Sequence, residues 1–147
     1  MKKNKIVILG GGESGIGTAI LGKKEGFEVF VSDYGKIKKK YKQVLLHYEI
    51  NWEEEAHSET EILSAGIVMK SPGISENTPI VLKLKKKGIR IVSEIEFAAT
   101  YTSATLIGIT GSNGKTTVAT MIHKILKDAG NNAAIAGNIG KSFAELV

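Results

Sequence analysis

The feature that most constrains this chain of 147 residues is a short apolar run that stops at a cluster of glycines. Residues 5–10 read Lys-Ile-Val-Ile-Leu-Gly, and an almost continuous apolar run of this length is typical of a strand buried on both faces of a parallel sheet. Glycines at positions 10, 12 and 15 follow, and residues 16–26 carry apolar side chains consistent with a helix before a terminal glycine. A second apolar run, residues 28–32, completes a strand–helix–strand unit of about 30 residues.

Strand and helix patterns continue to alternate along the chain. We predict strands at residues 65–70 and 89–92 and a helix at residues 77–87. Residues 44–50 carry a weaker strand pattern, and the acidic stretch at residues 53–61 is interpreted as a solvated loop or helix. This alternation predicts an α/β protein with a Rossmann-like, doubly wound parallel sheet.

A second glycine-rich turn lies in the last third of the chain. We predict a strand at residues 104–109, a turn at residues 111–114 and a helix from Thr117 onward. In such a turn, backbone N–H groups converge on an anion, the helix dipole adds positive potential, Lys115 reaches the outer phosphates and a hydroxyl ligates Mg²⁺. The general pattern GxxxxGK[ST] would place its first glycine at position 109, but the glycine stands at position 111. We therefore predict a shortened phosphate loop that binds ATP.

The two glycine-rich turns divide the chain into two parts. We predict a Rossmann-like domain over residues 1–93 and the start of a second, incomplete domain over residues 94–147. The second part would be the first βα unit of a P-loop-type ATPase domain, followed by another strand-like run at residues 133–136. Two different phosphate-binding turns in one chain suggest two different nucleotides.

The first turn also fits the pattern of a dinucleotide-binding site. Asp33 follows the second predicted strand, where an acidic residue would meet a ribose or a base. This pattern indicates a nucleotide without specifying which one; NAD is the general expectation, and a merely tight strand-to-helix turn is the alternative. Two more turns, Ser-Pro-Gly-Ile at residues 71–74 and Gly-Asn-Ile-Gly at residues 137–140, follow strand-like runs. Open α/β sheets bind ligands at the carboxyl ends of their strands.

The composition argues against several other classes of protein. The net charge is +5, but nearly all basic residues are lysine, and Arg90 is the only arginine. Base readout favours arginine and stacking aromatic residues, so the lysine runs at residues 36–42 and 83–87 are interpreted as solvated surface and not as a nucleic-acid site. The apolar run at residues 6–9 is too short for a signal peptide or a membrane span, and we expect a cytoplasmic protein. The three histidines and the acidic residues show no metal-ligand spacing.

Taken together, these residues resemble the Mur ligases of bacterial cell-wall synthesis, most closely the members that add D-glutamate. The resemblance is carried by the first glycine-rich turn, the turn at residues 71–74, Ser-Glu-Ile-Glu-Phe at residues 93–97, residues 108–117 and the turn at residues 137–140. These motifs run in this order through the whole chain. The shortened phosphate loop is the form that this family has, and the alanine-adding members usually have histidine in place of Asn113.

The resemblance implies a role for several residues. It implies UDP in place of NAD in the first domain, as part of the substrate UDP-N-acetylmuramoyl-L-alanine. The implied substrate-binding residues are Glu13, Ser14 and Asp33 at the UDP end, and Ser71, Gly73 and Asn138 around the diphosphate and sugar. The implied ATP-binding residues are Gly111, Ser112, Asn113, Gly114, Lys115, Thr116 and Thr117. Lys115 would neutralise developing phosphate charge and Thr116 would ligate Mg²⁺, so these two are the candidate catalytic residues.

The implied reaction is an ATP-dependent ligation. ATP phosphorylates the alanine carboxylate, and the amine of D-glutamate attacks the acyl phosphate. Further magnesium ligands and the D-glutamate site would lie beyond Val147, so we expect an N-terminal fragment that is inactive by itself. Two alternatives stay open: an NAD-dependent oxidoreductase domain, which NADH fluorescence would detect, and a non-catalytic uridine-nucleotide-binding protein, which stable monomeric folding would favour.

Overall fold

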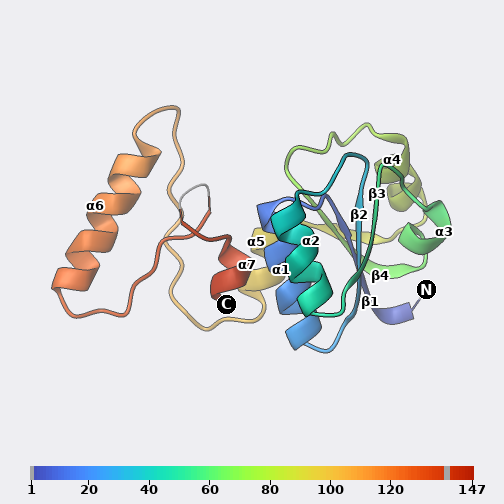
Figure 1. Cartoon of the computed structure of the whole chain (residues 1–147). Helices are drawn as coiled ribbons and strands as arrows, with labels where there is room; N and C mark the ends of the chain where they lie inside the picture. Colours follow the sequence, from blue (N-terminus) through green and yellow to red (C-terminus); the bar gives the residue numbers. More distant parts are fainter. Residues whose placement is uncertain (1, 138–139) are drawn as a thin grey trace.

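The computed structural model describes residues 2–137 and 140–147, and its central feature is a five-stranded parallel sheet (Figure 1). The strands lie in the order β3-β2-β1-β4-β5. Their bounds are β1 Lys2–Leu9, β2 Glu28–Asp33, β3 Asn51–Glu54, β4 Ala65–Lys70 and β5 Arg90–Val92. The winding starts at the central strand β1, proceeds outward to β3 and then returns to the other side of β1. This order confirms the predicted doubly wound parallel sheet.

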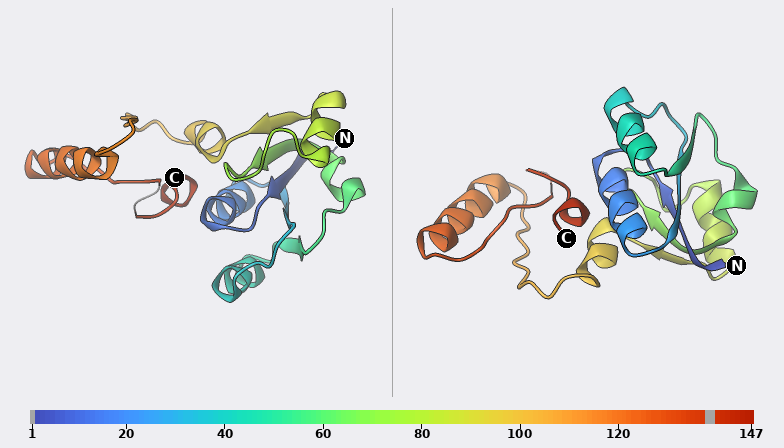
Figure 2. Two further views of the ribbon diagram at one scale, coloured as in Figure 1. Left: turned by 90° about the horizontal axis from the view of Figure 1, so that it is seen from above. Right: turned by 60° about the horizontal axis from the view of Figure 1, so that its bottom comes forward.

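Helices cover both faces of this sheet (Figure 2). Residues of α1, α5, α7 and α2 belong to the core on one face, and residues of α3 and α4 belong to the core on the other. The helix bounds are α1 Glu13–Lys24, α2 Lys39–His47, α3 Glu59–Ile62, α4 Pro79–Lys86, α5 Glu94–Ala99, α6 Lys115–Asp128 and α7 Phe143–Leu146.

The continuous apolar run of β1 is explained by burial on both sides. Ile6 and Ile8 point into the core beneath α1, whereas Val7 and Leu9 point into the core beneath α3 and α4. All four side chains are fully buried, and each contributes roughly 1.5–3 kcal/mol through removal of apolar surface from water. A strand with this pattern is stable only between two helical layers.

One expectation for the segment that follows β2 is wrong, and a second holds only in part. The predicted strand at residues 44–50 is largely helix α2, because Tyr41, Val44, Leu45 and Tyr48 recur at helical spacing and pack against the core. The acidic stretch at residues 53–61 is loop and then helix from residue 55 onward, as expected, but Glu53 and Glu54 belong to the edge strand β3, which pairs in parallel with β2. An edge strand has only one neighbouring strand, and the carboxylates of β3 accept hydrogen bonds, so its polar sequence is tolerated.

The region around the phosphate loop differs from the expected strand–helix unit. Helix α6 is present and begins at Lys115, two residues before the predicted start. Residues 104–109 form no strand, and residues 133–136 contribute only the isolated bridge between Ala136 and Lys141. The physical reason is that a strand needs a neighbour for its backbone hydrogen bonds, and neither run pairs with the sheet in the described part of the chain.

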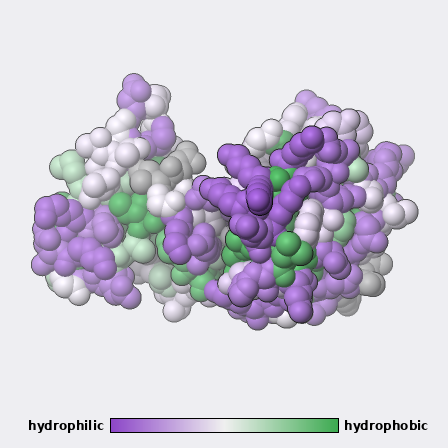
Figure 3. Space-filling model, viewed as in Figure 1, coloured by the Kyte–Doolittle hydropathy of each residue, from purple (hydrophilic) through white to green (hydrophobic). Residues whose placement is uncertain are grey.

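Helix α6 lies away from the sheet and its helices (Figure 1). None of its residues is buried, and Val118, Met121 and Ile125 on its apolar stripe are 45%, 59% and 64% exposed. In Figure 3 this part of the molecule shows both polar and apolar surface, and both kinds are also visible over the sheet region. None of the helices in the described part of the chain has the length and apolarity that a membrane span requires.

Candidate functional site

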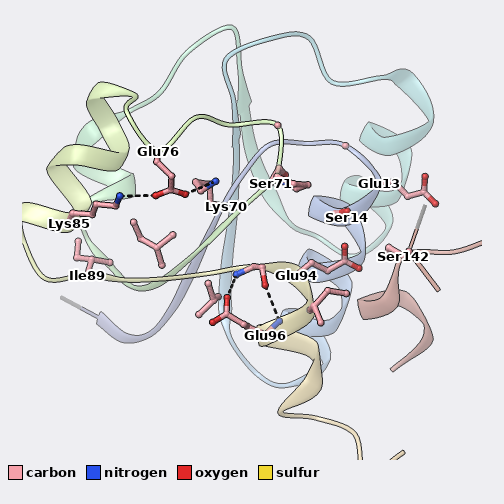
Figure 4. A pocket seen from close by; sticks show the side chains of 18 residues that line it. Glu13, Ser14, Lys70, Ser71, Glu76, Lys85, Ile89, Glu94, Glu96 and Ser142 are labelled. Atoms are coloured by element: carbon pink, nitrogen blue, oxygen red, sulfur yellow. Dashed lines mark hydrogen bonds and ion pairs between the residues drawn. The ribbon is translucent and has the colours of Figure 1, made fainter. Parts of the chain in front are cut away.

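A cleft of about 970 Å³ opens at the carboxyl ends of β1, β4 and β5 (Figure 4). Strands β1 and β4 are neighbours in the sheet, but the connections that leave them wind in opposite directions. This is the switch point at which open α/β sheets bind ligands. The cleft is lined by the first glycine-rich turn, the turn after β4 and the start of α5, and by Gly137 and Ser142 from the end of the chain.

The first glycine-rich turn requires glycine at two positions. Gly10 has φ +103°, and a Cβ on it would lie 2.5 Å from Ser71 Oγ. A Cβ on Gly15 would lie 1.9 Å from the carbonyl oxygen of Gly10, so the turn and the start of α1 could not pack this closely with any larger residue. Helix α1 begins directly behind the turn and brings Glu13 and Ser14 to the cleft.

Ser71 is the strongest indication of a ligand. Its Oγ is the one buried side-chain nitrogen or oxygen atom among the described residues that has no hydrogen-bond partner. Its backbone N–H donates to the carbonyl oxygen of Leu9 at 3.0 Å, which fixes the turn after β4 against β1. A buried hydroxyl without a partner is costly in a folded protein, and a polar ligand in the cleft would satisfy it.

The lysines of the cleft are held by a carboxylate. Lys70 Nζ lies 3.0 Å from Glu76 and donates to the carbonyl oxygen of Ile74 at 2.8 Å, and Lys85 Nζ lies 2.8 Å from the other oxygen of Glu76 (Figure 4). Hydrogen bonds from Lys85 and Lys70 hold the pKa of Glu76 below its ordinary value. The two ammonium groups are therefore fixed at one wall of the cleft, where they favour an anionic ligand.

Asp33 lies outside the set of residues that line the cleft. Its two carboxylate oxygens accept the backbone N–H groups of Gly11 at 2.6 Å and Gly35 at 2.7 Å. Asp33 thereby ties the glycine-rich turn to the loop after β2. Glu54 fixes the same loop, because it accepts the N–H of Ile37 and pairs with Lys42.

The phosphate loop is separate from the cleft: none of residues 111–117 lines it. Gly114 has φ +75°, and within the described loop no side chain caps the start of α6. Lys115 Nζ donates to the loop's own carbonyl oxygens, at 2.5 Å to Gly111 and 3.4 Å to Ser112. Exposed amides at a helix start beside a lysine suit a phosphate group. Binding of ATP by this loop stays a prediction.

The structure brings together only some of the predicted site residues. Glu13, Ser14, Ser71 and Gly73 share the cleft, whereas Asn138 lies outside the described residues. In the described part of the chain, no group of three His, Asp or Glu side chains could hold a metal ion.

Sequence reasoning gave no cleft role to seven polar residues that line the cleft: Lys70, Glu76, Lys85, Ser93, Glu94, Glu96 and Ser142. Ser93 and Glu96 form a capping box at the start of α5, with Ser93 Oγ accepting from Glu96 N and Glu96 accepting from Ser93 N. Hydrogen bonds from Ser93 hold the pKa of Glu96 below its ordinary value. The Ser-x-x-Glu spacing is the signal that could have identified this helix start.

A doubly wound parallel sheet with a cleft at its switch point is the architecture of Rossmann-like α/β domains. Residues 5–80 match the family model of the MurD N-terminal domain, and residues 109–145 match that of the Mur ligase middle domain. The chain belongs to the Mur ligase family.

Curated relatives agree with this assignment. The UDP-N-acetylmuramoylalanine–D-glutamate ligase of Christiangramia forsetii is 61% identical over 97% of this chain, and that of Bacteroides fragilis is 56% identical over 95%. The chain spans about a third of the length of these relatives, 32% in both cases.

Solved structures support the fold. A pseudomurein peptide ligase type C from Methanothermus fervidus has a TM-score of 0.63 at 29% identity, covering 98% of this chain and 31% of that one. The UDP-N-acetylmuramate:L-alanyl-gamma-D-glutamyl-meso-diaminopimelate ligase from Neisseria meningitides has a TM-score of 0.64 at 23% identity, covering 95% and 45%. The second likeness, at this low identity, concerns the fold alone.

Proposed function

We propose that this chain forms the substrate-binding part and the ATP phosphate loop of a UDP-N-acetylmuramoylalanine–D-glutamate ligase. The relatives with that name are the basis for the substrate. The observation that carries the proposal within the molecule is the buried, unpartnered hydroxyl of Ser71 at the switch point of the sheet. It lies against Gly10, in a cleft whose size suits a nucleotide sugar better than a single water molecule.

Different residues would bind different parts of the substrate. Ser71 and the backbone at Gly73 would hold the diphosphate and sugar, together with Asn138, and Lys70 and Lys85 would contribute a favourable field. Ser14 and the backbone near Glu13 would meet the UDP part. Asp33, which is held by its hydrogen bonds to Gly11 and Gly35, would lie at the uridine end, where its remaining lone pairs can accept hydrogen bonds from hydroxyl groups.

The phosphate loop would bind ATP in the complete enzyme. The N–H groups of residues 111–114 would surround the phosphates, and the Lys115 ammonium would exchange its bonds to Gly111 and Ser112 for phosphate oxygens. Thr116 would contribute a hydroxyl to Mg²⁺, which neutralises phosphate charge when it is bound. The γ-phosphoryl group passes to the alanine carboxylate, ADP leaves, and the D-glutamate nitrogen then attacks the acyl carbon with loss of phosphate.

In the proposed domains, residues 1–93 would supply most of the UDP-substrate site and residues 94–147 the start of the ATP site, while Asn138 from the second part would join the substrate site. We expect ATP to bind only weakly, because the phosphate loop is exposed and α6 behind it buries none of its residues. We therefore expect the chain to bind UDP, to bind ATP barely and to catalyse no ligation by itself.

The test is a calorimetric titration of the 147-residue chain with UDP, NADH and ATP. We expect the unaltered chain to bind UDP and to show no response to NADH. In Ser71→Ala, UDP binding should weaken roughly tenfold or more, because one buried hydrogen bond to a charged group is lost. Leu46→Ala, an exposed change remote from the cleft, is the control and should bind UDP like the unaltered chain. Binding of NADH without UDP would replace the proposal with the oxidoreductase alternative.

A further inference from the structure

The end of the chain returns to the helix that starts at the first glycine-rich turn. After α5 the chain leaves the sheet region, forms the phosphate loop and α6, and comes back as α7, which packs against α1 and α5 (Figure 1). Ala144 of α7 is 1% exposed and belongs to the core beneath α1. The segment with the phosphate loop is thus anchored at both of its ends on one helical layer.

The first contact that fixes this return is between Gly17 and Ser142. A Cβ on Gly17 would lie 1.9 Å from Ser142 Oγ, so glycine in the middle of α1 leaves room for the incoming serine. Ser142 is 2% exposed, and its Oγ accepts the N–H of Glu145 and caps α7. Glycine inside a helix is less stable than alanine, and the close approach of Ser142 explains why glycine stands at this position.

The second contact is a hydrogen bond from α7 to Glu94. Glu94 is the first residue of α5 and is 8% exposed, and its Oε1 accepts the backbone N–H of Ala144 at 3.0 Å. The capping box of Ser93 and Glu96 fixes the turn of backbone that carries Glu94. A hydrogen bond to a charged acceptor is among the stronger ones in proteins. Here it joins two residues that are 50 positions apart.

We propose that Glu94 is a positioning residue that docks α7 on α1 and thereby completes the wall of the substrate cleft formed by Ser142. Glu94 and Ser142 both line the cleft (Figure 4), together with Ser14 at the start of α1. When α7 is undocked, the cleft lacks this wall, and ligand affinity falls in proportion to the docked fraction. The effect on ligand rests on the proposed function, whereas the docking itself does not.

The experiment measures amide hydrogen exchange at Ala144 by NMR, and UDP affinity by calorimetry, in the full 147-residue chain. Glu94→Ala removes the acceptor, so we expect exchange at Ala144 to accelerate roughly tenfold or more and the dissociation constant for UDP to rise roughly threefold to tenfold. Glu94→Gln keeps an oxygen that can accept the same N–H and should retain most of both properties. Glu25→Ala, an exposed change at the other end of α1, is the matched control.

Thermodynamic linkage between UDP binding and the docking of α7 provides a measurement that would not change if Glu94 only stabilised the fold. If docking strengthens UDP binding, saturating UDP must slow exchange at Ala144 in the unaltered chain, and it must do so less in Glu94→Ala. Gly17→Ala, which expels Ser142 by a different route, should reproduce the loss, while Gly108→Ala adds a methyl group in open space and should not. These variants decide the matter if Glu94→Ala fails to fold.

Three results would overturn the proposal: unchanged protection of Ala144 in Glu94→Ala, equal damage by Glu94→Gln, or full UDP affinity in a variant with α7 undocked. A chain that binds no UDP at all, yet shows the expected exchange pattern at Ala144, would remove the proposed function and leave the docking role of Glu94 in place.

Discussion

The first glycine-rich turn and the phosphate loop each lead into a helix, but they differ in how their surroundings pack against them. Helix α1, behind the first turn, buries eight consecutive residues, from Gly15 to Gly22. Helix α6, behind the phosphate loop, buries none of its 14 residues. The first turn is packed between β1, β4 and the loop after β2, whereas the phosphate loop contacts mainly itself. A phosphate-binding turn can therefore be specified locally, but its rigidity depends on the strands beside it.

The largest expected difference between the two regions is the cost of removing an apolar side chain. Leu21 is 1% exposed beneath the sheet and Ile125 is 64% exposed on α6. We expect Leu21→Ala to lower the free energy of unfolding by about 2–5 kcal/mol, because it leaves a cavity, and Ile125→Ala to change it by less than about 0.5 kcal/mol. The measurement is urea unfolding followed by the fluorescence of Trp52, the only tryptophan, which packs against the same core.

A cost above about 1 kcal/mol for Ile125→Ala would contradict this comparison, because it would mean that the α6 stripe is covered and unfolds with the sheet. Circular dichroism of both variants serves as the control that α6 remains helical, since isoleucine and alanine both support a helix.

The second expected difference concerns glycine. Alanine at position 15 would meet the Gly10 carbonyl oxygen at 1.9 Å, whereas alanine at position 114 would meet nothing within 4 Å. We expect Gly15→Ala to cost about 1–3 kcal/mol of unfolding free energy through overpacking. Gly114→Ala strains a backbone at φ +75°. It should nevertheless change the free energy of unfolding, measured by Trp52 fluorescence, by less than about 0.5 kcal/mol, because the loop is not part of the core. Equal effects at the two glycines would contradict the separation of the regions.

The same contrast explains how much of the fold could be predicted from the sequence. The strand at residues 65–70 and the parallel order were predictable because burial on two faces requires a continuous apolar run, and the short strand predicted at residues 89–92 is present as β5, Arg90–Val92. The edge strand β3 was not, because its side chains are polar and its identity depends on pairing with β2. The run at residues 104–109 has a strand's composition, but no partner among the residues that the structure describes gives it a strand's hydrogen bonds.

The candidate site was predictable to a similar degree. Glu13, Ser14, Ser71 and Gly73 follow strand ends in sequence, so the switch-point rule brings them to one cleft. Glu94 and Ser142 could not be assigned to it, since a carboxylate that accepts a backbone N–H 50 residues away leaves no pattern in the sequence. The domain boundary and the individual ligand roles stay predictions.

The third expected difference lies in how the helices start. Ser93 caps α5 through its hydroxyl, whereas Gly114 precedes α6 without a side-chain cap. We expect Ser93→Ala to cost about 0.5–2 kcal/mol. Ser112→Ala, in the uncapped loop, should cost less than about 0.5 kcal/mol, and both values come from urea unfolding with the Trp52 signal. A cost for Ser112→Ala equal to that for Ser93→Ala would indicate a cap on α6 that the structure lacks.

The smallest expected effect is a dependence on pH that belongs to the sheet region alone. The four described carboxylates whose pKa values lie below the ordinary 4.5 are on this side of the molecule: Glu53, Glu54, Glu76 and Glu96. Burial raises the pKa of Glu53, but hydrogen bonds from Ser32 and Ser58 and the charge of His57 outweigh it. Near pH 4.5 the native state therefore binds fewer protons than the unfolded chain, and stability falls as the pH drops through this value.

Glu53→Gln provides the sharpest version of this test. At pH 7 the variant lacks the charged acceptor for Ser32 and Ser58 and should be less stable than the unaltered chain. As the pH falls below 4.5, the unaltered chain also loses this charge by protonation, so the gap between the two urea midpoints should narrow. Glu25→Gln, exposed on α1, should show no such convergence. A gap that stays constant from pH 7 to pH 3.5 would mean that the charge of Glu53 adds nothing to the β2–β3 edge beyond what a neutral amide supplies.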